Sequence, residues 1–117
     1  GKSNDFYTKM ISSKDVGYFR IGKDGFYQEV NDTWLKLYKY DSKDEITGKH
    51  FSLSRTKDDF VALKNSVDRV LKGETIPFGI TRRYCKDGSI GYHHITMTPV
   101  YEGDEIVGFE GFIVDKT

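Results

Sequence analysis

Three short turn signals constrain the fold of this chain more than any other feature. Asp24-Gly25, Asp87-Gly88 and Gly103-Asp104 each separate two segments in which apolar and polar residues tend to alternate. Asp and Gly favour tight turns because both tolerate positive φ, and a period of two is typical of β-strands. The sequence therefore predicts a β-hairpin over residues 16–30 and three further strands over residues 78–85, 90–101 and 106–114.

Helical periodicity occupies the middle of the chain. Residues 57–72 carry apolar side chains at helical spacing, and Gly73 follows where a helix commonly ends. Asn31 is a suitable N-cap for a short helix around Trp34 and Tyr38, because its side-chain oxygen can accept a backbone N–H group. Strands at both ends that enclose a helical middle predict an α+β fold, with one antiparallel sheet and helices packed on one face.

Another helix is expected at the N-terminus, over residues 1–14. Its apolar face consists of Phe6, Tyr7, Met10 and Ile11. A helix this short is not stable alone, so we expect it to cap the outer face of the sheet or to pack on the same helix of a second copy. The second arrangement predicts a homodimer.

Composition narrows the possible functions. The chain has 117 residues, which allows one domain. Its 18 Lys and Arg residues balance 18 Asp and Glu residues, so we expect no contact with nucleic acid or a membrane. No apolar run is long enough to span a bilayer, and a single cysteine excludes an internal disulfide. Because the chain begins with Gly rather than Met, we expect a domain excised from a larger protein, and we expect that protein to be cytoplasmic.

The order of these elements, with particular residues at their joints, resembles a PAS domain, the sensor module of many bacterial and archaeal signalling proteins. Residues 17–21 with Asp24-Gly25 resemble the opening hairpin of that family, and Val30-Asn31 with Trp34-Leu35 resembles its strand-to-helix joint. Further matching segments are residues 37–40, 45–49, 86–89, 107–108, 111–112 and 115–117. None of these motifs is specific alone; their order and separation across residues 16–117 carry the resemblance.

The resemblance implies a five-stranded sheet of order 2-1-5-4-3 within a PAS sensor domain over residues 15–117. It also implies a covalently linked output domain, most often a histidine kinase of a two-component system, less often a diguanylate cyclase or a transcriptional regulator. Asp115 and Thr117 match the triplet that joins sensor to output in this family, which suggests signal transmission; frayed terminal residues are the alternative. A ligand-free dimerisation module of the same fold remains open, and a closed core would favour it.

The sequence lacks the residues that bind the cofactors known for PAS domains. Flavin-photochemical members carry a reactive cysteine after the short helices, but residues 49–56 contain none and Cys85 lies on a predicted strand. One group of haem-binding members takes its axial histidine from the longer helix, and residues 57–72 contain no histidine. We therefore expect neither haem nor flavin, whereas a small organic ligand remains possible.

Strand alternation selects candidate pocket residues. His93 and His94 are adjacent on a predicted strand, so they point to opposite faces. His93 shares its face with Ile95 and Met97, which places it inside, either as a core-edge histidine or as a polar group that faces a ligand. Phe109 and Phe60 are further candidates for the pocket lining.

Counting back from the turn at residues 86–89 places Gly79, Thr81 and Arg83 on the inner face of the preceding strand. That register leaves Phe78, Ile80 and Tyr84 outside, unless a bulge shifts it by one residue or something covers the outer face. If the register holds, Gly79 and Gly111 leave space for a ligand. Arg83 would then offer its guanidinium to a carboxylate, or it could be exposed near the strand end.

Catalysis and metal binding have no support in the sequence. The pairs Asp58-Asp59 and Asp44-Glu45 lie at predicted helix starts, where the helix dipole stabilises carboxylates. No nucleophile–base order, phosphate-binding loop or metal-ligand spacing is present, and adjacent histidines on one strand cannot chelate one metal. We therefore predict neither an enzyme nor a metal site in this domain.

Overall fold

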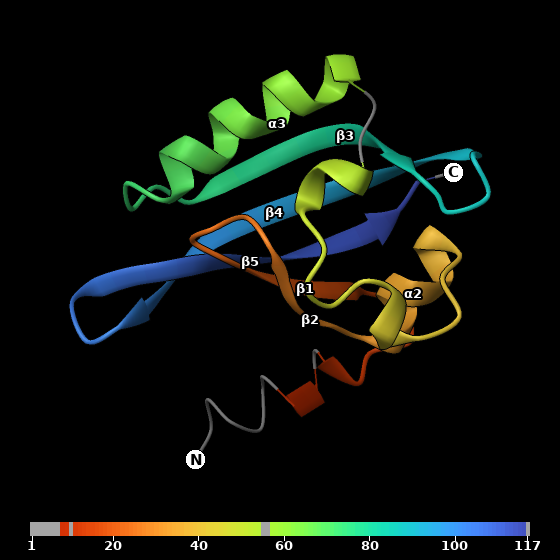
Figure 1. The fold of residues 1–117 in the computed structure, drawn as a ribbon, viewed down its shortest axis with the longest axis horizontal. Helices are drawn as coiled ribbons and strands as arrows, with labels where there is room; N and C mark the ends of the chain where they lie inside the picture. The colour runs from red at the N-terminus through yellow and green to blue at the C-terminus, as the bar shows by residue number, and fades with distance from the viewer. Residues whose placement is uncertain (1–7, 10, 55–56, 117) are drawn as a thin grey trace.

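The chain forms strands and helices in the order that the sequence pattern predicts. The computed structural model describes residues 8–9, 11–54 and 57–116, with strands β1 (Gly17–Gly22), β2 (Tyr27–Val30), β3 (Ile76–Tyr84), β4 (Ile90–Glu102) and β5 (Glu105–Asp115). The strands form one antiparallel sheet in the order β2-β1-β5-β4-β3 (Figure 1). The α+β class is confirmed, and so is the strand order with first and last strands paired at its centre.

The helical segments connect β2 to β3. They are α2 (Asp32–Tyr38), the short 3₁₀ helices η1 (Lys43–Glu45) and η2 (Phe51–Ser54), and α3 (Lys57–Val70) (Figure 1). Asn31 is the N-cap of α2, as predicted: its Oδ1 accepts hydrogen bonds from Trp34 N and Tyr18 N, both at 2.9 Å.

Aromatic side chains build much of the core between the helices and the sheet. Trp34, 1% exposed, stacks on Tyr38 with 4.1 Å between ring centroids. Phe19 and Phe109 meet edge to face at 6.3 Å. Such rings bury a large apolar area each, which compensates for the low aliphatic content of the chain.

The predicted N-terminal helix falls largely outside the described residues, as do Phe6, Tyr7 and Met10. Where the structure describes this segment, Ser12 N donates to Thr8 O at 3.0 Å, in the manner of a helical turn. Its packing on the sheet or on a second copy stays a prediction.

The register predicted for β3 holds beyond Gly79. Ile80 and Tyr84 are exposed on the outer face, at 60% and 41%, whereas Arg83 is buried. A bulge lies between Pro77 and Ile80, before the residues that line the inner face. The outer face of the sheet therefore keeps an apolar surface, to which Tyr92 and Val114 also contribute.

Candidate ligand and signal-transmission site

The space between the helices and the centre of the sheet is nearly filled. The cavity there has a volume of about 20 Å³, enough for about one water molecule. Ile95, Met97 and Phe109, three of the predicted pocket residues, line it. The centre of the fold thus has no room for an organic ligand in this conformation.

A larger groove of about 280 Å³ lies between α3 and β3. Leu63, Ile80 and Ile95 contribute apolar walls. Thr81 also lines the groove, and its Oγ1 is buried without a hydrogen-bond partner in the part of the chain that the structure describes. Buried hydroxyl groups are normally hydrogen-bonded, so an unsatisfied one beside a groove marks a position where a ligand or water can bind.

An ion pair lies at the edge of this groove. Arg82 Nη2 donates to Asp59 Oδ1 at 2.8 Å, and both residues line the groove. This hydrogen bond raises the pKa of the Arg82 guanidinium. Because each charge already has its partner, a ligand in the groove does not need a charge of its own.

Arg83 is buried, with 5% of its surface exposed. Its Nε donates to Leu37 O at 3.0 Å, its Nη1 to Tyr92 O at 3.1 Å and its Nη2 to Asp115 Oδ1 at 3.0 Å. Gly91 leaves space for the guanidinium, since a Cβ there would lie 2.5 Å from Arg83 Cζ. The predicted inner position is therefore confirmed and the solvent-exposed alternative is wrong. The guanidinium binds groups of its own chain, including Asp115 at the end of β5.

His93 belongs to the same buried cluster. It is 0% exposed, its Nδ1 lies 3.5 Å from Arg83 Nη1, and its ring centroid lies 6.2 Å from that of Tyr38. The predicted inward orientation is confirmed, and His94 is exposed on the other face. His93 lines neither the central cavity nor the α3–β3 groove.

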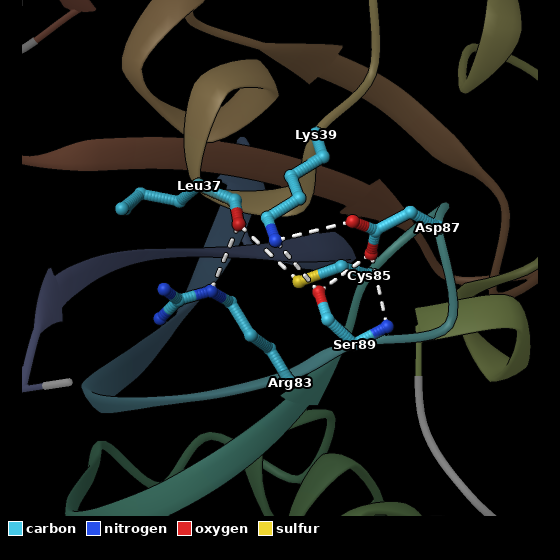
Figure 2. Close-up of polar contacts among 6 residues, drawn as sticks. All are labelled: Leu37, Lys39, Arg83, Cys85, Asp87 and Ser89. Atoms are coloured by element: carbon cyan, nitrogen blue, oxygen red, sulfur yellow. Dashed lines mark hydrogen bonds and ion pairs between the residues drawn. The ribbon is translucent and has the colours of Figure 1, made fainter.

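The C-terminal end of α2 is fastened to β3 and to the turn between β3 and β4 (Figure 2). Leu37 O, which accepts a hydrogen bond from the buried guanidinium, also accepts one from Cys85 Sγ at 3.4 Å. Lys39 Nζ donates to Asp87 Oδ2 at 3.2 Å and to Ser89 Oγ at 2.8 Å. Hydrogen bonds from Ser89 and then Lys39 lower the pKa of Asp87 to about 2. These contacts join α2 to the β3–β4 hairpin, at the edge of the sheet opposite β2.

Other predicted site residues lie apart from this cluster. Gly111 leaves no space for a ligand, because a Cβ there would lie 1.9 Å from Thr96 O and 2.7 Å from Phe19 Cζ; that prediction is wrong. Gly79 is exposed and has open space around it instead of facing the interior. Phe60 lines a separate hollow on the other flank of α3, and Thr117 lies outside the described residues.

Sequence reasoning missed Leu37 and Cys85 as partners in this site. A main-chain carbonyl carries no residue-type signal, so nothing in the sequence could identify Leu37 O as an acceptor. The turn at residues 86–89 held a usable signal, because an Asp side chain often binds the backbone two residues further on. Asp87 Oδ1 accepts from Ser89 N at 2.9 Å in this way.

Within the described ranges, no cluster of three or more His, Cys, Asp or Glu side chains could hold a metal ion. No helix among the same residues has the length and apolar character needed to cross a membrane.

The sequence profile described as the PAS fold matches residues 5–116. The chain therefore belongs to the PAS family and is a sensory, signalling domain. No curated protein sequence matches it significantly.

Solved structures with the same fold come from several signalling classes. A PAS domain from Colwellia psychrerythraea has a TM-score of 0.87 at 21% identity and covers 100% of this chain and 98% of its own. A domain of a sensory box sensor histidine kinase/response regulator from Geobacter sulfurreducens has a TM-score of 0.78 at 18% identity, covering 97% and 94%. The PAS domain of a LuxR-family transcriptional regulator from Burkholderia thailandensis, in complex with ethanol, has a TM-score of 0.74 at 12% identity, covering 95% and 96%. At these identities the likeness concerns the fold alone.

Proposed function

We propose that this PAS domain binds a small, uncharged organic molecule in the groove between α3 and β3 and that binding alters the end of β5 at Asp115. We further propose a cytoplasmic sensor histidine kinase as the parent protein, with the catalytic step in a covalently linked output domain. The Geobacter relative named above is part of a protein of that class. The proposal includes no haem, flavin or catalytic residue in this domain.

One observation carries the proposal: Thr81 and Arg83 lie two residues apart on the same face of β3. Thr81 lines the groove, its hydroxyl is buried beside it, and Arg83 Nη2 holds Asp115 Oδ1 at 3.0 Å. A ligand would reach the hydroxyl by separating α3 from β3, and that separation would shift this segment of β3. Because Arg83 is packed against Gly91 and bonded to Leu37 O, its guanidinium would transmit that shift to Asp115 and to the chain that follows.

The chemistry of the groove favours an uncharged ligand with one hydroxyl or carbonyl group. Its walls are apolar, and the Asp59–Arg82 pair satisfies both charges at its edge. Thr81 Oγ1 can donate or accept one hydrogen bond. A volume of about 280 Å³ suits a molecule below the size of most drugs. The Burkholderia PAS domain was solved with an uncharged alcohol, ethanol.

Titration of the domain with cyclohexanol and with cyclohexanecarboxylate tests the ligand part. We expect saturable NMR shifts at Thr81 and along α3 for the alcohol, and weaker binding of the anion. Thr81→Val should weaken cyclohexanol binding by about tenfold, the effect of one lost hydrogen bond. Thr96→Val, on the exposed outer face, is the matched control and should have no effect. If Thr81→Val and Thr96→Val bound cyclohexanol equally well, the alcohol would bind outside the α3–β3 groove.

The transmission part is tested in the full-length parent. Asp115→Asn removes the carboxylate that Arg83 holds, and we expect altered autophosphorylation with normal expression. Asp104→Asn, in the exposed β4–β5 turn, is the control. Unchanged output and unchanged ligand response in Asp115→Asn would show that this contact carries no signal.

A ligand-free dimerisation module is the second candidate. The cavity of about 20 Å³ at the centre of the fold favours it, as does the apolar outer face, where Ile80 is 60% and Tyr92 45% exposed. A homodimer that persists in dilute solution, together with no saturable ligand shifts in the groove, would select this alternative.

A further inference from the structure

We propose a second binding site on the other flank of α3, for a free aromatic amino acid. The site is a hollow of about 300 Å³ between the β1–β2 turn, η2, α3 and β5. None of its lining residues belongs to the α3–β3 groove. The inference therefore stands independently of the function proposed above.

The wall formed by the β1–β2 turn is held in place by backbone hydrogen bonds. Phe51 N donates to Gly25 O at 3.0 Å, and Lys23 N donates to Val107 O at 2.9 Å. Gly25 has φ of +88°, and a Cβ at this residue would lie 2.6 Å from His50 Nε2. The turn thus packs directly on the imidazole ring. A ligand would meet a pre-formed wall and would lose little affinity to ordering of the chain.

Aromatic rings form the floor of the hollow. Phe51 stacks on His50 with 4.6 Å between centroids and contacts Phe60 at 5.4 Å. Phe109, 1% exposed, meets Phe51 edge to face at 6.3 Å, and Phe51 is itself 5% exposed, so these two rings form the packed base of the floor. His50 and Phe60 are half-buried and present the ring surface that a ligand can reach. A planar ring placed against His50 and Phe60 can form the offset or edge-to-face contacts that aromatic pairs prefer.

Charges of both signs surround the floor. Lys23, in the β1–β2 turn, and Lys64, on α3, are exposed on opposite walls. Asp24 directly follows Lys23 in the turn, and Asp68 lies one helical turn after Lys64. Within the described ranges none of these four side chains forms an ion pair, although Asp24 Oδ1 accepts a hydrogen bond from Phe26 N at 3.1 Å. Two ammonium groups and two carboxylates are therefore available to a ligand.

His50 adds an oriented donor. Ser52 N donates to His50 Nδ1 at 3.2 Å, so Nδ1 is an acceptor and the neutral ring carries its proton on Nε2. Nε2 faces Gly25, and both residues line the hollow. An N–H group at this position can bond a carboxylate oxygen.

The equal number of positive and negative side chains around the hollow indicates the class of ligand. The rim has no net charge, so a simple anion or a simple cation would gain from one pair of groups and be repelled by the other. A zwitterion with an aromatic ring satisfies the whole site. Its ring packs on the floor, its carboxylate contacts Lys23, Lys64 and His50, and its ammonium contacts Asp68 and Asp24. The volume lies at the lower end of ligand pockets, which suits a molecule of amino-acid size.

Calorimetric titration of the domain with L-phenylalanine, L-tyrosine and L-tryptophan tests this site. At least one of them should bind, with NMR shifts at Gly25 and His50. Phenethylamine and 3-phenylpropionate, which each lack one charge, should bind about tenfold more weakly, as for one lost charged contact. Cyclohexylalanine keeps both charges but lacks the aromatic ring, so it should bind more weakly by up to about tenfold, the contribution of one aromatic pair. No saturable binding of any of the three amino acids up to roughly 10 mM would overturn the proposal. Equal affinity for 3-phenylpropionate would overturn it too.

Variants separate this site from the groove. Lys64→Gln and Asp68→Asn change exposed side chains, so both should fold, and each should weaken amino-acid binding by about tenfold. Lys57→Gln, at the start of the same helix and outside the hollow, is the matched control and should bind normally. Thr81→Val should bind the amino acid normally while its binding of cyclohexanol is weakened by about tenfold. Loss of amino-acid binding in Thr81→Val but not in Lys64→Gln would assign the ligand to the groove and refute the second site.

Discussion

Replacing Arg83 by Met removes the guanidinium that joins α2, β4 and the end of β5, while keeping an unbranched side chain. The wild-type group donates to Leu37 O at 3.0 Å, to Tyr92 O at 3.1 Å and to Asp115 Oδ1 at 3.0 Å. Of these acceptors, Tyr92 O retains a bond from Lys116 N at 2.7 Å. Among the described residues, Leu37 O would keep only the weak thiol donor, Cys85 Sγ at 3.4 Å.

The expected cost follows from the burial of each bond. A hydrogen bond from a charged group contributes about 1.5–3 kcal/mol, so the bonds to the two carbonyl groups together contribute about 3–6 kcal/mol. The side chain of Asp115 is 43% exposed, so that contact adds no more than about 1 kcal/mol. Apolar packing of Met offsets part of the loss. We therefore expect Arg83→Met to destabilise the domain by about 3 kcal/mol and Asp115→Ala by about 1 kcal/mol.

Urea unfolding followed by tryptophan fluorescence measures both effects. Trp34 is the single tryptophan of the chain and is 1% exposed, so its emission reports loss of the core. With a slope of about 1.5 kcal/mol/M, the midpoint should fall by about 2 M in Arg83→Met and by less than about 1 M in Asp115→Ala. Arg82→Met, on the exposed face of the same strand, is the control and should change the midpoint little.

An equal loss in Asp115→Ala and Arg83→Met would refute this reasoning, because the half-exposed ion pair would then hold the guanidinium rather than the buried carbonyl bonds. If Arg83→Met does not accumulate, Arg83→Lys keeps the charge while losing the planar donor geometry. If the ion pair to Asp115 dominated, the urea midpoint of Arg83→Lys would lie between those of the wild type and Asp115→Ala. We expect it to lie below that of Asp115→Ala, because Lys cannot replace the bonds to both carbonyl groups.

Gly111→Ala should destabilise the domain by about 3 kcal/mol, since the new methyl group meets a backbone oxygen, whereas Gly79→Ala, in open space, should be nearly neutral in the same urea assay. Because the pKa of Asp87 is lowered from 3.8 to about 2, its ionised form stabilises the fold above about pH 4, and this contribution is lost as pH falls through 2. The difference in Tm between the wild type and Asp87→Asn should therefore shrink over that interval. Removal of residues 1–14 should dissociate the expected homodimer or lower solubility; an unchanged species in light scattering would count against that packing.

Local features were predictable from the sequence because they depend on neighbouring residues. The turn at Asp24-Gly25 and the cap at Asn31 need only the backbone preferences of a few residues, and both are present. The inward position of His93 followed from alternation along one strand. The strand order rested on resemblance to a family, and the structure confirms it.

The content of the site was less predictable, because space and partners depend on residues far apart in the chain. Gly111 suggested an opening, but Thr96 and Phe19, from other strands, occupy the position next to it. Phe60 was placed in the central pocket, whereas it faces the hollow beside the β1–β2 turn. Alternation shows which face a side chain takes and contains no information about how closely the opposite layer approaches.

The sequence by itself determined the hairpins and the helix cap at Asn31, since turn chemistry, capping and strand alternation act over a few residues. It left Arg83 open between the inner face and an exposed strand end. Tertiary structure alone decided that Arg83 is buried and what it does there. Its partners Leu37 and Asp115 lie 46 and 32 positions away, and one of them is a main-chain oxygen that any residue type could supply. They meet the guanidinium only because α2 packs against β1 and β5 pairs with β4, and that arrangement results from burial of the whole core.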